Sequence, residues 1–256
     1  MLLCVFTTVQ AIAQTDEKEL FLKAQETYQI ALRQGGQQKV QNMLKAAAQF
    51  EVLADKHGIE NGYLFYNIGN CYFEAGESGK AVLYYLKAKR LISGFKDLEN
   101  NLEVAKAGLN VPEAPKTWWS DIIQGIFFWH YMLDYSTRRI LFVISFSLIW
   151  LFLIAMIFLR SFLLKGGVIL SVLLTFFFGG SYLMSFYQLH FIKSGVIVSK
   201  EAIVRKGPGI TYEKYYEQPL PGGTEFRVLE TRDNWRRVRL NTGDELWIKT
   251  DDTGLI

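Results

Sequence analysis

Residues 140–159 read ILFVISFSLIWLFLIAMIFL, a run of 20 positions that contains no charged side chain, no amide and no proline. A second uncharged run covers residues 166–189. About 20 apolar residues in a helix are enough to cross the hydrocarbon core of a bilayer, and a longer run can do so with some tilt. Only RSFLLK at 160–165 separates the two runs, so we expect a tight hairpin of two transmembrane helices.

The side of the membrane on which the flanking segments lie depends on two signals. Positive charge favours the cytoplasmic side, but Arg160 and Lys165 between the runs are matched by Arg138 and Arg139 before them. Residues 1–13 are uncharged and end in AIA, which is typical of a signal-peptide cleavage site, with a buried N-terminal helix as the alternative. Because a hairpin returns the chain to the side it left, an export signal would place both flanking domains outside the cytoplasm.

The membrane segments themselves contain few functional groups. Neither run holds Asp, Glu, Lys, Arg or His, which disfavours an ion pump or a transporter. Ser171, Thr175 and Gly179 recur at four-residue spacing and predict a small-residue face for helix packing. That face would contact either the first run of the same hairpin or a helix of a partner protein.

Residues 111–139 predict a linker and then an aromatic helix that lies in the membrane interface. Proline punctuates the linker, and residues 118–135 are rich in Trp and Tyr, whose amphipathic rings favour the interface. His130 and His190 are too few to form a zinc site. We therefore predict no metal here and no cofactor anywhere in the chain.

The segment before the linker predicts an all-α domain. Residues 65–88 read FYNIGNCYFEAGESGKAVLYYLKA, and the segment 62–95 around them resembles a tetratricopeptide repeat. Gly69 and Ala81 are small where the two antiparallel helices of such a repeat cross. Cys71 occupies a position usually held by alanine, so we expect a buried thiol that makes no disulfide.

One repeat does not bury its apolar face alone, so further helices are expected beside it. Residues 17–34 and 38–56 supply a degenerate preceding copy, and residues 97–105 supply a capping helix. We therefore expect a tetratricopeptide-like helical array of about five helices over residues 16–110.

The resemblance implies a concave groove that binds a peptide or a helix of a partner protein. The residues expected to line it are Tyr66, Asn67, Asn70, Phe73 and Glu74. Asn70 matches an asparagine of arrays that clamp a C-terminal carboxylate, but Tyr66 stands where those arrays have lysine, which argues against a carboxylate ligand. An array that only spaces or dimerises is the alternative.

Residues 195–256 predict a small all-β barrel. Short strands of alternating character are separated by glycine turns, and the strings VRKGPG at 204–209 and LPGGTEF at 220–226 resemble a bacterial SH3-like domain. That resemblance implies binding of cell-wall peptides or docking of proteins. The candidate ligand surface is aromatic and consists of Tyr212, Tyr215, Tyr216 and Trp247, flanked by Arg236, Arg237 and Arg239. In the alternative, the tryptophans belong to the core and the arginines to a solvated strand face.

Charge and motif content disfavour two broad classes of function. The chain has a net charge of +3, and residues 14–116 hold 13 basic and 13 acidic side chains, so no sustained basic segment favours nucleic acid. No paired nucleophile and base, and no clustered ligands, appear at catalytic spacing, so we do not expect an enzyme.

The order of signal peptide, tetratricopeptide array, two-span hairpin and SH3-like domain resembles BatE-like proteins of the Bacteroides aerotolerance operon. This resemblance implies a bacterial inner-membrane protein with both soluble domains in the periplasm. It also implies partners, namely von Willebrand factor A-type membrane proteins and a MoxR-type ATPase, and a role in stress response. We therefore expect a membrane-anchored scaffold, with peptidoglycan binding or envelope-stress sensing by the SH3-like domain as the alternative. A factor that holds unfolded clients is a third hypothesis.

Overall fold

The computed structural model describes residues 2–92, 94–111, 118, 122, 133, 135–159 and 161–256, and gives only the backbone of residues 2–15, 188 and 189. The chain divides into two compact units. One consists of residues 1–114 together with residues 193–256, and the other consists of residues 115–192. The described residues are mostly helical, with one small set of antiparallel strands.

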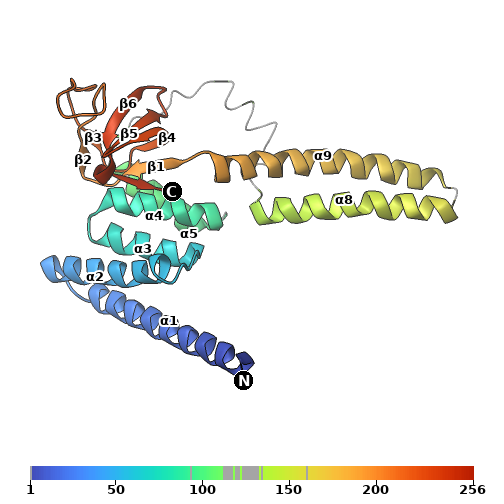
Figure 1. Ribbon diagram of the computed structural model, residues 1–256, viewed down its shortest axis with the longest axis horizontal. Helices are drawn as coiled ribbons and strands as arrows, with labels where there is room; N and C mark the ends of the chain where they lie inside the picture. The colour runs from blue at the N-terminus through green and yellow to red at the C-terminus, as the bar shows by residue number, and fades with distance from the viewer. Residues whose placement is uncertain are drawn as a thin grey trace. The chain divides into compact units, whose positions relative to one another are not determined.

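Five consecutive helices form the first part of the larger unit, and each packs against the next (Figure 1). They are α1 (Leu2–Leu32), α2 (Gly36–Asp55), α3 (Gly62–Glu74), α4 (Ser78–Leu91) and α5 (Lys96–Ala107). The residues of the expected export signal lie in the first turns of α1. The predicted helices at 17–34 and 38–56 correspond to the rest of α1 and to α2.

The crossing of α3 and α4 depends on a residue without a side chain. A Cβ atom at Gly69 would lie 2.5 Å from Cδ1 of the Tyr85 ring, so only glycine lets the two helices approach this closely. Ala81 and Tyr85 are fully buried on the α4 side. Asn61 begins α3 because its side chain accepts hydrogen bonds from the backbone N–H groups of residues 63 and 64.

The C-terminal part of the larger unit is an antiparallel sheet of five strands in the order β6-β5-β4-β1-β7, with a separate pair β2-β3. The strands are β1 (Ser194–Ile197), β2 (Glu201–Ala202), β3 (Leu220–Pro221), β4 (Glu225–Arg232), β5 (Trp235–Leu240), β6 (Glu245–Lys249) and β7 (Thr253–Leu255), with the 3-10 helix η1 (Thr250–Asp252) before β7. Their own core includes Ile197, Phe226, Leu246 and Ile248.

The sheet and the helices share a tightly packed interface, a contact that the sequence left open. Helix α4 packs against β1 and β7, and Val196 of β1 belongs to the buried cluster of the helices (Figure 1). A Cβ atom at Gly79 of α4 would lie 2.8 Å from the carbonyl oxygen of Ile197. Arg90 donates hydrogen bonds of 2.7 Å to the carbonyl oxygen of Ile256 and to Oγ of Ser194. Residues on both sides of the hairpin therefore build one compact body.

The second unit contains two antiparallel helices, α8 (Tyr135–Phe158) and α9 (Phe162–Phe191), that lie side by side (Figure 1). Among the described residues, these two are long and apolar enough to cross a membrane, which suggests membrane association. Large apolar side chains cover their outer surface, and Phe158 and Phe162 are at least 80% exposed. Such a surface is unfavourable in water and suits a lipid environment.

The helices of the hairpin are longer than the apolar runs suggested. Helix α9 begins at Phe162 because the side chain of Ser161 accepts a hydrogen bond from the N–H of Leu163, which shortens the predicted six-residue loop. Helix α8 extends back to include Arg138, which is buried and donates a 2.6 Å hydrogen bond to Oγ of Ser185 on α9. The predicted interfacial helix at 118–135, with His130, lies almost entirely outside the described residues.

The small residues of α9 face α8 in this unit. Ser171 and Gly179 are buried, Thr175 is partly buried, and a Cβ atom at Gly179 would lie 3.0 Å from the ring of Phe142. The hydroxyls of Ser171 and Thr175 bond to carbonyl oxygens of their own helix. This placement accounts for the spacing of the three residues without a partner protein.

Candidate functional site

The clearest cavity in the described part of the helical domain lies between α1, α3 and the segment after α2. It has a volume of about 430 Å³. Its lining comprises Glu17, Lys18, Phe21, Leu53, Ile59, Asn61, Tyr63, Leu64 and Asn67. The lining combines apolar side chains with polar and charged ones. A cavity of this kind can receive an apolar side chain while the surrounding groups bind polar atoms.

A smaller cavity of about 120 Å³ adjoins the first one and shares Asn67 with it. It is lined by Gln25, Tyr28, Gln29, Phe50 and Asn67. The α1 residues that line the two cavities recur at intervals of three and four, so they lie on one face of the helix. We call this combined feature the α1–α3 groove.

Two side-chain contacts connect the elements that line the groove. The rings of Phe21 and Phe50 meet edge to face with centroids 5.6 Å apart. Nδ1 of His57 lies 3.4 Å from Oε1 of Glu17, which ties the segment after α2 to α1. Burial, followed by the negative charges around it, raises the pKa of Tyr28 to about 12, so its hydroxyl stays protonated at neutral pH and can donate a hydrogen bond.

Of the five residues predicted to line a groove, Asn67 alone lines these two cavities. Oδ1 of Asn70 accepts hydrogen bonds from the hydroxyl of Tyr85 at 2.8 Å and from Nδ2 of Asn101 at 3.0 Å. Asn101 also donates to the hydroxyl of Tyr66, whose ring packs against Phe95. Tyr66 and Asn70 therefore join α3 to α4 and α5.

The other two predicted groove residues also have partners within the domain. Phe73 is partly buried against the helical core, and Glu74 forms a 2.5 Å ion pair with Lys39 of α2. The sequence did not predict the α1 side of the groove, because residues 17–34 have no motif like the one at 62–95. The recurrence of Lys18, Phe21 and Gln25 at helical spacing is the signal that points to it.

Cys71 lies in the core, as expected of a buried thiol. Burial raises its pKa to about 12, so the reactive thiolate is scarce at neutral pH. Among the described residues, no group of three or more His, Cys, Asp or Glu side chains is arranged to hold a metal ion.

The tyrosines of the predicted β ligand surface are partly engaged with Asp244. Tyr215 and Tyr216 donate hydrogen bonds to its two carboxylate oxygens at 3.2 and 2.7 Å, and burial raises the pKa of Tyr216 to about 12. Tyr212 is 50% exposed, whereas Trp247 is only 8% exposed. The tyrosine pair and Tyr212 come from the loop between β2 and β3, and Trp247 comes from β6.

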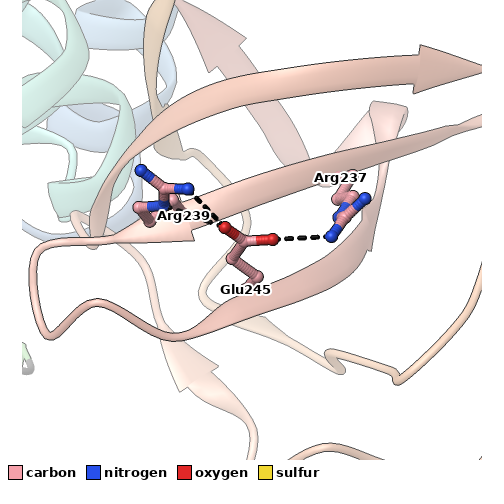
Figure 2. A network of polar contacts seen from close by, with 3 residues as sticks. All are labelled: Arg237, Arg239 and Glu245. Atoms are coloured by element: carbon pink, nitrogen blue, oxygen red, sulfur yellow. Dashed lines mark hydrogen bonds and ion pairs between the residues drawn. The ribbon is translucent and has the colours of Figure 1, made fainter.

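The arginines of β5 divide between the two faces of the strand because successive side chains alternate. Arg236 turns toward η1 and β7, where its guanidinium donates to the carbonyl oxygen of Thr250 and to the hydroxyl of Thr253. Arg237 and Arg239 lie on the opposite face and share Glu245, as Figure 2 shows. The three arginines therefore do not form one flank of a single site.

Neither the family models, the curated proteins nor the solved structures that were compared include a match to this chain.

Proposed function

We propose that the chain is a membrane-anchored adaptor that captures a segment of a protein partner in the α1–α3 groove. The observation that carries this proposal is that two cavities lined by α1 and α3 share Asn67. An extended peptide suits this shape because an apolar side chain can enter the larger cavity. The amides of Asn67, Gln25 and Gln29 are then available for the peptide backbone.

The resemblances of sequence extend this proposal. The repeat signature supports a tetratricopeptide array for α1–α5, and the glycine-turn strings support an SH3-like identity for the β domain. The BatE-like segment order favours a von Willebrand factor A-type membrane protein, with a MoxR-type ATPase, as the partner. On this proposal, both soluble domains face the periplasm of a bacterium.

The test is site-specific photocrosslinking in intact cells. A photoreactive residue at Gln25 lies in the groove, and one at Lys45 lies on the exposed face of α2 as the matched control. We expect one or a few stoichiometric membrane proteins at Gln25 and none at Lys45. The same adducts at both positions, or a broad mixture of unfolded clients at Gln25, would contradict a specific adaptor.

A further inference from the structure

The outer surface of β4, β5 and β6 carries an excess of positive charge. Residues that pair directly across antiparallel strands share a face, and the pairs Arg227–Arg239, Arg232–Trp235 and Trp235–Lys249 define this one. Its cationic members are Arg227, Arg232, Arg237, Arg239 and Lys249, all exposed. Its carboxylates are Glu230 and Glu245. We call this surface the arginine face.

The two carboxylates orient the guanidinium groups without neutralising them all. Glu245 accepts from Arg237 at 2.6 Å and from Arg239 at 3.0 Å, so one negative charge serves two positive ones (Figure 2). The side chains of Arg237 and Arg239 remain 45% and 52% exposed. Each guanidinium has five N–H donors, and Glu245 occupies one or two of them, so the remaining donors are available to an external anion.

An aromatic ring also contacts one arginine of this face, Arg232. The guanidinium carbon of Arg232 lies 5.8 Å from the ring centre of Trp247, a cation–π arrangement. Trp235 is buried on the same face. A group that is already held by a ring and a carboxylate loses less freedom when it binds a ligand.

The stretch of chain between the candidate membrane span and the sheet is short. The candidate span of α9 ends at Tyr187, α9 continues to Phe191, and β1 begins at Ser194. Four helical residues and three extended ones reach at most about 16 Å. Ser194 of β1 pairs with Arg227 of β4, which pairs with Arg239 of β5. Two strand spacings therefore add about 10 Å to the distance from the end of the candidate span. A tether this short gives even a weak attraction to the membrane surface a high effective concentration.

We propose that the arginine face binds the phosphate headgroups of anionic phospholipid in the membrane that the hairpin enters. Guanidinium groups bind phosphate oxygens in a bidentate manner, and basic clusters beside a membrane segment are attracted to acidic lipid. The proposal rests on the membrane anchoring stated above but not on the groove. Such binding would hold the sheet, and the helices packed against it, against the bilayer surface.

The test uses the full chain in lipid nanodiscs with one fluorophore on the arginine face. Cys4 and Cys71 are replaced by alanine, Lys249→Cys carries the fluorophore, and a nitroxide on the lipid headgroup quenches it. Neutral phosphatidylcholine discs are compared with discs that contain about 30% phosphatidylglycerol. We expect quenching about threefold stronger with the anionic lipid, and loss of that increase at about 0.5 M salt, where charges are screened.

Two double variants in this labelled background decide the outcome. R237Q/R239Q should reduce quenching to the neutral-lipid level, whereas the matched control K45Q/K96Q, at exposed positions of α2 and α5, should retain it. Equal quenching in both lipids, or an increase that survives R237Q/R239Q, would overturn the proposal. So would variant-sensitive binding of the full chain to peptidoglycan sacculi in place of anionic discs. Extraction of the chain from membranes by alkaline carbonate would instead refute the anchoring itself.

Discussion

Lys106 of α5 forms an ion pair with Glu225 of β4, although 119 positions separate the two residues along the chain. The helices before the hairpin and the strands after it can meet in this way only if they lie in the same compartment. Any crossings of a membrane between residues 111 and 193 must therefore be even in number. This condition agrees with two spans in α8 and α9, and it does not depend on the hydropathy of either helix.

The first prediction concerns this shared compartment. Single cysteines at Asn110 and Lys249 should react with a membrane-impermeant maleimide from the same side, because the segments that carry them belong to one body. A cysteine at Lys165, next to the turn between α8 and α9, should react only from the other side. Labelling of intact cells and of permeabilised cells measures this. Labelling of Asn110→Cys and Lys249→Cys from opposite sides would contradict the two-span arrangement.

A second prediction tests the interface between α4 and the sheet. A Cβ atom at Gly79 would lie within 3 Å of the backbone oxygens of Ile197 and Val198, which cannot move without disturbing β1. Gly79→Ala should therefore lower the free energy of unfolding by about 1–3 kcal/mol, although alanine favours a helix more than glycine does.

Gly108 provides the matched control for this substitution. It ends α5 with an ordinary negative φ of −81° and has open space where a Cβ atom would lie. Gly108→Ala should change stability by no more than about 0.5 kcal/mol. Denaturant titrations of the detergent-solubilised chain measure both variants, and equal losses would show that the contact at Gly79 is unimportant.

The outline of the fold could be predicted from the sequence because its signals are local. Gly69 indicates a close helix crossing, and the uncharged run from Ile140 indicates a long apolar helix. Neither inference requires knowledge of distant residues. The structure bears out the helices, the hairpin and the antiparallel strands at this level.

The two cavities of the α1–α3 groove could not be predicted in the same way because their lining residues come from elements that are distant in sequence. Tyr66 and Asn70 occupy the expected helix face, yet Asn101, 31 positions beyond Asn70, bonds to both. Likewise, nothing local to Gly79 shows that a β-strand covers it. Whether a polar side chain of one helix has a hydrogen-bond partner depends on the residues of the neighbouring element, and the local sequence does not show these.

A third prediction concerns pH and the buried thiol of α3. The pKa of Cys71 rises from 9.0 to about 12 on folding, so the folded chain keeps a proton that the unfolded chain releases. This contribution is fully present below pH 9 and is lost as the pH rises toward 12. Across that interval stability should fall by up to about 1.4 kcal/mol per pH unit from this group.

Cys71→Ala separates this effect from the titration of nearby tyrosines. The variant keeps a small apolar side chain in the core, so its unfolding free energy should fall less steeply between pH 9 and pH 11. Urea titrations at several pH values compare the two slopes. Identical slopes would show that the thiol ionises as readily in the folded chain as in the unfolded one.

The last prediction separates binding from stability in α3 and its neighbours. Asn67 lines the groove, whereas Asn101 of α5 donates hydrogen bonds to Tyr66 and Asn70 of α3. We therefore expect the first amide to act in binding and the second in stability. Asn101→Ala should cost about 1–2 kcal/mol of stability, since it removes two hydrogen bonds, but it should leave capture of the partner intact. Asn67→Ala should keep stability within about 0.5 kcal/mol and weaken the captured complex roughly tenfold. Thermal unfolding and quantitative co-purification measure the two effects. If Asn101→Ala released the partner while Asn67→Ala retained it, the ligand surface would have to be sought around Tyr66 and Asn70, which the sequence also predicted to line a groove.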